Sequence, residues 1–369
     1  MTERNPYLQD IERGLTSLDL TVLDGHSILI TGATGLIGGC LVDVLMHCPA
    51  STCRVYASGR NEERARKRFA PYWDDSRFHF VQGDVTTPLD TNQTFDYIIH
   101  AASNASPNFF KEKPVEVIKS NIKGVENLME YGLSNGMSRM LYISSGEIYG
   151  ERQQTNADVD NTDVFTETDS GYVDCATPRA CYPSSKRAAE TLCVAYAAEY
   201  GADVVIARPC HTYGPYFTES DNRVYAQFIR NLLAGENLVL RSRGEQFRSW
   251  LYVVDCAFAL LTILLRGSKG EAYNVADERS NITIRQLAEL LAEAEGRQVV
   301  FDIDETNGNT TPITRAVFST EKLARLGWQS RTPIAEDWLI RWQPSAYFVN
   351  SGMMTTEWKC RFSTGGISI

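Results

Sequence analysis

Apolar runs of buried-strand length alternate with longer amphipathic segments from residue 26 to residue 209. The apolar runs predict strands over 26–32, 54–59, 78–84, 95–103, 140–145 and 202–209. The segments between them carry apolar residues at helical spacing and predict helices over 36–48, 61–70, 117–136 and 183–201. Because strands alternate with helices, we expect a parallel sheet with right-handed crossovers and helices on both of its faces.

The alternation loosens after residue 215, and this change predicts a second, smaller unit. The chain is expected to be an α/β protein, in which a Rossmann-type doubly wound parallel sheet carries a smaller C-terminal α/β substrate-binding domain. The predicted boundaries are 25–215 for the Rossmann domain with 249–266 returning to it, 216–248 and 267–345 for the substrate-binding domain, 1–24 for a short amphipathic helix and linker, and 346–369 for a peripheral tail without a clear period.

Composition narrows the range of partners and compartments. Hydrophobic residues make up 43% and charged residues 22% of the 369 residues, which is ordinary for a globular protein. The formal net charge of -10 argues against a nucleic-acid partner, because binding phosphates requires a basic face. The nine cysteines are irregularly spaced, which predicts a reducing compartment and no zinc site or disulfide framework. Because no signal-peptide core and no apolar stretch of ~18 residues is visible, we expect a cytoplasmic protein without a membrane partner.

A glycine-rich loop follows the first predicted strand directly. In TGATGLIGG, Gly32, Gly35 and Gly38 have G-x-x-G-x-x-G spacing at the junction of strand and helix. Glycine permits a tight turn and a close approach of the backbone to a pyrophosphate, and the following helix offers free N–H groups to that anion. Since this is the structural context that the motif requires, the loop predicts a dinucleotide site.

The end of the second strand leaves the choice of dinucleotide open. It reads Ser58-Gly59-Arg60-Asn61 and lacks the carboxylate that usually binds the ribose 2′-hydroxyl of NAD. Arg60 either pairs with the 2′-phosphate of NADP, stacks on the adenine, or is a solvated arginine at the start of a charged helix. Asp84, after the third strand, either reaches the adenine edge or caps a turn. NAD+ is the expected cofactor, with NADP+ as the alternative.

A tyrosine and a lysine are spaced for general base chemistry. Tyr182 and Lys186 lie four residues apart at the start of a predicted helix, so the ammonium is expected beside the phenol. A neighbouring cation favours the phenolate, and Tyr182 would then accept a proton from a sugar hydroxyl near neutral pH. Ser145 ends the fifth strand, where ligands of parallel sheets bind, and is a candidate to hydrogen-bond the same hydroxyl.

Over about residues 25–340 the chain resembles the extended short-chain dehydrogenase/reductase family of nucleotide-sugar epimerases, dehydratases and decarboxylases. The resemblance rests on TGATGLIGG, GDV, HAAS, SNIKG, SSGEIYG, CYPSSK, ARPCHTYGP and RSWLYVVD. It implies a catalytic triad of Ser145, Tyr182 and Lys186, with Lys186 also holding the nicotinamide ribose and Asn121 ordering these groups. It also implies a homodimer formed through helices around 115–133 and 183–200.

The same resemblance assigns two sets of binding residues. The dinucleotide is expected at Gly32, Thr34, Gly35, Leu36, Ile37, Gly38, Arg60, Asp84, Val85, Ala101, Ala102, Ser103, Asn121, Ser144, Tyr182, Lys186 and Pro209. The nucleotide-activated sugar is expected at Ser106, Glu147, His211, Arg223 and Arg248. Taken by themselves, the two arginines are also compatible with surface positions and His211 with a structural role, while Asp255 is expected to brace the helix that follows it.

Within the family the chain most resembles UDP-glucuronate decarboxylases. HAASNASPNFF, ACYPSSKRAAETLCVAY and SSGEIYG are similar to their motifs, and the last places Glu147 where those enzymes keep a glutamate. The chain departs from them at Gly59-Arg60, where they carry an acidic residue, and at His211, where they carry asparagine.

The resemblance implies oxidation of the sugar at C4, after which a C5 carboxylate is a labile β-keto acid. Glu147 is the candidate base for a 4,6-dehydratase, although Gly146 stands where thymidine-linked glucose dehydratases carry an acidic Asp. A 4-epimerase requires neither group. An NADPH-dependent 4-keto-sugar reductase and a non-catalytic dinucleotide sensor are the remaining alternatives.

Overall fold

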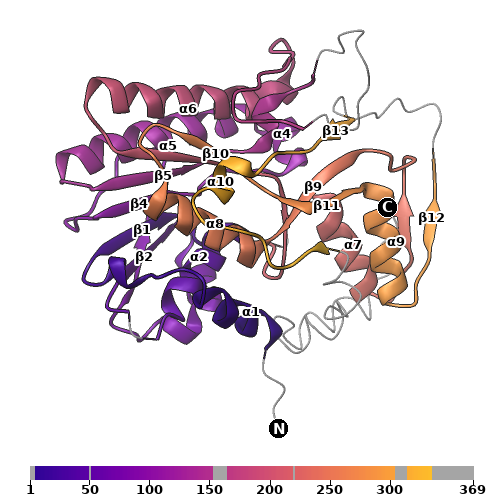
Figure 1. Cartoon of the computed structure of the whole chain (residues 1–369), viewed down its shortest axis with the longest axis horizontal. Helices are drawn as coiled ribbons and strands as arrows, with labels where there is room; N and C mark the ends of the chain where they lie inside the picture. Colours follow the sequence, from indigo (N-terminus) through magenta and orange to yellow (C-terminus); the bar gives the residue numbers. More distant parts are fainter. Residues whose placement is uncertain (1–4, 50, 153–163, 219–220, 304–313, 335–369) are drawn as a thin grey trace.

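The computed structural model describes residues 5–49, 51–152, 164–218, 221–303 and 314–334. A parallel seven-stranded sheet forms the centre of the larger part, in the order β10-β6-β5-β4-β1-β2-β3 (Figure 1). Its strands are β1 (Ser27–Thr31), β2 (Arg54–Gly59), β3 (Phe78–Gln82), β4 (Tyr97–His100), β5 (Arg139–Ile143), β6 (Val204–Pro209) and β10 (Ala272–Val275). All six strands predicted from the sequence are present, and the predicted α/β class is confirmed.

Helices cover both faces of this sheet because its central strands are apolar on both sides. In β1, Ile28 and Ile30 pack into one core and Leu29 into another. Figure 1 shows covering helices above the sheet and others below it. Those above are α5 (Pro114–Ser134) and α6 (Cys181–Glu199), and those below are α1 (Pro6–Leu15), α2 (Leu36–Met46) and α8 (Val253–Arg266).

The strand order reverses between β1 and β4, since β2 and β3 lie on one side of β1 while β4, β5 and β6 lie on the other. The loops that leave the carboxyl ends of β1 and β4 therefore diverge and leave a crevice, which is where ligands bind in open parallel sheets. The short α3 (Glu62–Arg68) and α4 (Pro107–Glu112) follow β2 and β4 at this edge.

The C-terminal part adds a smaller sheet. There β9 (Phe247–Tyr252) pairs with β7 (His211–Tyr213), β11 (Asp277–Thr283) and β13 (Arg315–Ala316), while β8 (Leu238–Leu240) pairs with β12 (Val299–Phe301). Beside them lie α7 (Val224–Leu233) and α9 (Ile284–Ala294), and the short α10 (Glu321–Ala324) contacts β10. Strand β10 falls within the span 267–345 that the sequence analysis placed in the substrate-binding unit. It pairs with β6 because the buried helix α8 packs on β5 and β6 and delivers the chain to that edge.

The N-terminal segment is anchored to the larger part. Tyr7 and Ile11 of α1 are buried, and the hydroxyl of Tyr7 donates to the buried carboxylate of Asp43 in α2 at 2.6 Å. The predicted short helix is therefore present and belongs to the main core. The predicted tail, 346–369, lies outside the described residues. Within the described part of the chain, no helix combines the length and hydropathy needed to span a bilayer.

Candidate functional site

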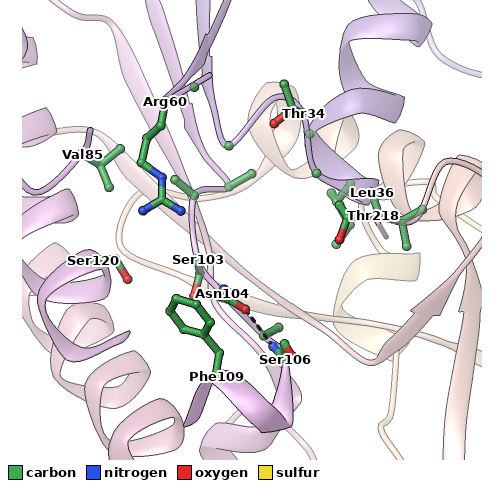
Figure 2. A pocket seen from close by; sticks show the side chains of 18 of the residues that line it. Thr34, Leu36, Arg60, Val85, Ser103, Asn104, Ser106, Phe109, Ser120 and Thr218 are labelled. Atoms are coloured by element: carbon green, nitrogen blue, oxygen red, sulfur yellow. Dashed lines mark hydrogen bonds between the residues drawn. The ribbon is translucent and has the colours of Figure 1, made fainter. Parts of the chain in front are cut away.

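A cavity of about 360 Å³ lies at the carboxyl ends of β1, β2 and β4. In Figure 2, Arg60 and Val85 lie on one side of it, Leu36 and Thr218 on the other, and Ser103, Asn104 and Phe109 below. The predicted residues in its lining are Gly32, Thr34, Gly35, Leu36, Ile37, Gly38, Arg60, Asp84, Val85, Ala101, Ala102, Ser103, Ser106 and Arg223. The structure thus brings most of the expected dinucleotide positions into one cleft.

The glycine loop brings its backbone so close to neighbouring backbone atoms that two of its glycines leave no room for a side chain. Such an exposed backbone turn suits a pyrophosphate. Gly32 has a φ of +66°, and a Cβ there would lie 2.7 Å from the Cα of Ala102. A Cβ on Gly38 would lie 2.5 Å from the carbonyl oxygen of Gly32. Gly35 precedes α2 without a side-chain cap, so the first N–H groups of that helix are left for a ligand.

At the opposite end of the cleft, Arg60 lies between two carboxylates. Its Nη1 is 3.1 Å from Oε1 of Glu116 and 3.8 Å from Oδ2 of Asp84. Asp84 also accepts hydrogen bonds from the N–H and hydroxyl of Thr86, at 2.9 and 2.8 Å. Burial alone would raise the pKa of Asp84, but these hydrogen bonds and Arg60 bring it below its usual value. Asp84 therefore caps a turn and lines the cleft at the same time.

Tyr182, Lys186 and Ser145 come together beneath the cleft. Tyr182 is 5% exposed, stacks on Phe110 with ring centroids 4.9 Å apart, and is hydrogen-bonded to the side chain of Ser145. The Nζ of Lys186 donates to the carbonyl oxygen of Ile143 at 2.7 Å and lies 5.8 Å from the centre of the Tyr182 ring. The proximity expected from the i,i+4 spacing is present, with the ammonium over the face of the phenol ring.

The charge state of this group differs from the sequence-based expectation. Burial raises the pKa of Tyr182 to about 12, with a further rise caused by Glu147 and a partial lowering by Ser145 and nearby arginines. Burial also lowers the pKa of Lys186 to about 7. In the protein without its ligands, burial therefore favours the neutral phenol over the phenolate that the spacing predicts.

Asn121 and Ser144 complete this side of the site. Asn121 is fully buried, donates to the hydroxyl of Ser185 in α6 and accepts from Ser103, both at 2.8 Å. It therefore ties α5 to α6 and to the loop after β4. The Ser144 hydroxyl is buried and has no hydrogen-bond partner among the described residues, which fits a position beside a bound group. Pro209 ends β6 and is buried against β10.

The expected sugar-binding residues lie in a charged region next to Tyr182. Glu147, in the short helix η3 (Gly146–Tyr149), forms an ion pair with Arg179 of η4 (Pro178–Ala180) at 2.8 Å. Arg223 pairs with Asp221 at 2.6 Å. Arg248 is 5% exposed and donates to two backbone carbonyls, and burial lowers its pKa to about 10 although Glu147 opposes this shift. The surface alternative for Arg248 is therefore excluded by its burial.

His211 lies opposite Trp250 in the pairing of β7 with β9, with the two ring centroids 5.4 Å apart. Burial lowers its pKa to about 3, and Arg248 and Arg223 add to this lowering, so the imidazole is neutral. Its Nδ1 is buried without a hydrogen-bond partner among the described residues. This favours a position facing substrate over that of a satisfied structural histidine.

Two other predicted residues have clear contacts. The Ser106 hydroxyl donates to Oδ1 of Asn222 at 2.6 Å. Asp255 accepts hydrogen bonds from the N–H groups of Arg331 and Thr332 at 3.0 and 2.9 Å. It therefore braces the segment that passes over α8.

Sequence reasoning missed several residues at the site. The additional lining residues are Ser58, Gly59, Arg64, Gly83, Asn104, Ala105, Phe109, Glu116, Ser120, Thr218 and Asp221. Arg179 was also missed, although the sequence shows it as a charged residue three positions before Tyr182. Glu116 and Arg60 are 56 positions apart in the sequence, so no local sequence pattern predicts their contact.

Comparison with known sequences places the chain among nucleotide-sugar enzymes. The model of the NAD dependent epimerase/dehydratase family matches residues 28–276. UDP-glucuronic acid decarboxylase 6 of Arabidopsis thaliana is 32% identical over 311 residues, covering 84% of this chain and 85% of the relative. UDP-glucuronic acid decarboxylase 1 of Xenopus tropicalis is 31% identical over 339 residues, covering 89% and 75% of the two chains.

Solved structures share the fold at lower identity. UDP-glucose 4-epimerase of Thermotoga maritima, solved with UDP-glucose, has a TM-score of 0.74 at 23% identity and covers 88% of this chain and 99% of its own. The dTDP-glucose 4,6-dehydratase DesIV of Streptomyces venezuelae, solved with NAD, has a TM-score of 0.73 at 24% identity and covers 90% and 99%. At these identities the likeness establishes the fold.

Proposed function

The chain belongs to the NAD-dependent epimerase/dehydratase family, and we propose that within it the protein decarboxylates UDP-glucuronate through oxidation at C4 of the sugar. The similarity to UDP-glucuronic acid decarboxylases over most of both chains supports the substrate. The observation that carries the proposal is the charge around Glu147. Glu147 pairs with Arg179 at 2.8 Å and opposes the lowering of the Arg248 pKa by burial, so two guanidinium groups lie close to this carboxylate. In this proposal both arginines also contact the carboxylate of the sugar.

The residues of the chain suit the first step. In its deprotonated form, Tyr182 accepts the proton of the sugar 4-hydroxyl on its phenolate oxygen, and Ser145 hydrogen-bonds the same sugar oxygen. Lys186 lies over the phenol ring and is anchored by the Ile143 carbonyl, so it is placed to orient the ligands, and in its protonated form it favours proton loss from Tyr182. A dinucleotide held by the glycine loop would supply the hydride acceptor for C4 and the hydride for the later reduction.

The second step needs little further chemistry. Oxidation at C4 makes the C5 carboxylate part of a β-keto acid. The bond from C5 to the carboxyl carbon breaks, CO₂ leaves, and the electron pair passes to the oxygen at C4. A proton then adds at C5, and reduction at C4 gives a UDP-linked pentose. Arg179 and Arg248 hold the carboxylate in place before it is lost.

The surroundings of Gly146 favour decarboxylation over dehydration. Elimination of a 6-hydroxyl needs an acid close to that oxygen, and Gly146 stands at the position where an Asp would supply it. A Cβ on Gly146 would lie 2.5 Å from the ring carbon Cζ of Phe318. Since Phe318 is buried and packs on Tyr149 and Phe165, an aspartate has no room there.

The proposal includes NAD+ as cofactor, reaction in the cytoplasm and a homodimer. The eight described cysteines are free thiols, as a reducing compartment allows. The dimer would form through α5 and α6, which pack side by side and expose Val115, Ile118, Leu133 and Val194. Light scattering tests it: V194E should give a monomer, whereas V22E, at a similarly exposed valine of η1 (Thr21–Leu23), should not. A wild-type monomer would contradict the dimer.

Mass spectrometry of the purified protein with UDP-glucuronate, without added dinucleotide, tests the reaction. We expect loss of one CO₂, because a bound dinucleotide is restored in each cycle. UDP-glucose and dTDP-glucose serve as control substrates, and Y182F as the control protein. Loss of water from either hexose would favour a dehydratase instead, and unchanged masses throughout would leave epimerisation or an NADPH-dependent reduction.

A further inference from the structure

Arg60 occupies the position at the end of β2 that in dinucleotide-binding sheets contacts the adenosine ribose. An arginine there normally suits the 2′-phosphate of NADP, while a carboxylate suits the 2′-hydroxyl of NAD. In this chain the cation is already engaged by Glu116 at 3.1 Å and by Asp84 at 3.8 Å. The residue that follows β2 therefore does not by itself decide which dinucleotide binds.

Glu116 is the central group of this cluster. It stands in the first turn of α5, where the helix dipole favours a negative charge, and it lines the main cleft. Its second oxygen, Oε2, lies 3.7 Å from the Nζ of Lys113. One carboxylate thus pairs with two cations at the adenosine end of the cleft.

The remaining charges in this region come from several elements. Beyond Glu116, the cleft continues into a hollow lined by Arg60, Asp84, Thr86, Glu112, Lys113, Pro114, Val115, Lys119 and Ser120. Arg64, from α3, donates to the Thr34 carbonyl at 3.2 Å. Cations and carboxylates are therefore close to balance here, and the loss of one carboxylate would leave Arg60 and Lys113 available to a phosphate.

We propose that Glu116 sets the preference for NAD+ over NADP+, by pairing with Arg60 and Lys113 in place of a 2′-phosphate. Other NAD-binding folds place a carboxylate at the end of the second strand, where it disfavours a 2′-phosphate. In this chain the carboxylate comes from α5, and it acts by pairing with the arginine that follows β2. The inference rests on the dinucleotide role proposed above and does not depend on which sugar is processed.

The effect should be moderate. Arg60 and Glu116 are 63% and 38% exposed, so water screens their attraction, and the pair does not lock the arginine. A 2′-phosphate would nevertheless meet a carboxylate 3.1 Å from the guanidinium that it needs. We expect removal of this charge to change the ratio of the two affinities by about five- to ten-fold.

Binding measurements on the full chain, freed of bound dinucleotide, test the proposal. Isothermal titration with NAD+ and with NADP+ gives the ratio of dissociation constants for wild type, E116Q and E112Q. Glu112 lines the same hollow and forms no ion pair with Arg60 among the described residues, so E112Q removes an equal charge without freeing the arginine. We expect E116Q to shift the ratio towards NADP+ and E112Q to leave it within two-fold.

A third protein, the double variant R60A/E116Q, tests whether the gain in NADP+ affinity requires the Arg60 guanidinium or follows only from the loss of a negative charge. It should lose the gain in NADP+ affinity, because the guanidinium that follows β2 is then absent. An unchanged ratio in E116Q, or an equal shift in E112Q, would overturn the inference. Because binding is measured without turnover, a protein that binds NAD+ and shows these shifts but decarboxylates nothing would contradict only the proposed reaction.

Discussion

The candidate site has two halves that are built differently: a dinucleotide half, which is the cleft proposed to hold the dinucleotide, and a sugar half, which is the charged region beside Tyr182 proposed to hold the sugar. In the dinucleotide half, backbone atoms make the site: Gly32 and Gly35 lie between β1 and α2, Gly38 lies in the first turn of α2, and two of the three glycines have no space for a Cβ. In the sugar half, charged side chains make the site. They come from separate elements, as with Glu147 in η3 and Arg248 in β9.

This difference affects how each half changes. A backbone cradle depends on the fold itself, so it holds the same group wherever the fold is kept and tolerates almost no substitution. A set of paired side chains is held by ion pairs such as Glu147 with Arg179 and Arg223 with Asp221, and it can be altered one residue at a time. We therefore expect damage to the first half to affect binding and stability together, and damage to the second to affect chemistry or specificity alone.

The largest effect should come from Y182F, which breaks the sugar half without touching the glycine loop. Removing the group that accepts the proton should lower turnover of UDP-glucuronate by about 10³-fold. The dinucleotide retained through purification, measured by its absorbance after denaturation, should stay the same. A variant that keeps more than a tenth of wild-type turnover would show that Tyr182 is not the base.

The corresponding substitution in the dinucleotide half is G38A. Its Cβ would lie 2.5 Å from the Gly32 carbonyl, so strand and helix must separate. We expect a loss of about 3 kcal/mol in the free energy of unfolding, together with loss of retained dinucleotide. Urea titration measures the first and absorbance the second. G83A is the control, because a Cβ on Gly83 meets nothing within 4 Å although the residue lines the same cavity.

Asp255 lies outside both halves, and its ionisation should affect the free energy of unfolding without affecting dinucleotide binding. Burial raises the pKa of Asp255 to about 6, although the N–H groups of Arg331 and Thr332 oppose this rise. The folded state therefore favours the protonated acid, and its contribution is complete below the unfolded pKa of about 4 and is lost as the pH rises through about 6. We expect the free energy of unfolding to fall by about 3 kcal/mol over that range. In D255N this part of the pH dependence should vanish, while dinucleotide retention at pH 7 stays unchanged.

The smallest effect should be that of R179M, which sharpens the comparison within the sugar half. Losing one of the two guanidinium groups beside Glu147 should raise the KM for UDP-glucuronate about ten-fold. Inhibition by UDP-glucose, which has no carboxylate, should change little. An equal loss for both ligands would mean that Arg179 only supports the shape of the site.

The sequence was most informative where the interactions are local. Strand, glycine turn and helix follow one another between residues 26 and 48, so hydrophobic pattern and glycine spacing were sufficient to locate the cradle. The same holds for Tyr182 and Lys186, whose proximity follows from one helical turn. Burial is not local: Tyr182 is enclosed by Phe110 and other elements, and the spacing of Tyr182 and Lys186 does not express the desolvation that raises the pKa of Tyr182.

Long-range pairing limited the prediction elsewhere. The surroundings of Arg60 depend on Glu116, which α5 brings alongside from far along the chain, so the sequence left NAD and NADP open. Strand β10 joined the main sheet because of the packing of α8, which no pattern in 267–345 expressed. For His211, the preference for a position facing substrate rests on its neighbour Trp250 and on an Nδ1 without a hydrogen-bond partner among the described residues, neither of which the sequence pattern expresses.

The contact between Gly146 and Phe318 also has an evolutionary consequence. An ancestor or descendant with an aspartate at position 146 would need a smaller residue at 318 in the same protein. The aspartate alone collides with the ring, and a small residue at 318 alone leaves a hole in an aromatic cluster that costs about 3–5 kcal/mol. Each single substitution is thus disfavoured, whereas the two together are acceptable. We therefore expect the residues at positions 146 and 318 to change together. An evolutionary route between decarboxylation and dehydration would pass through a sequence that folds poorly.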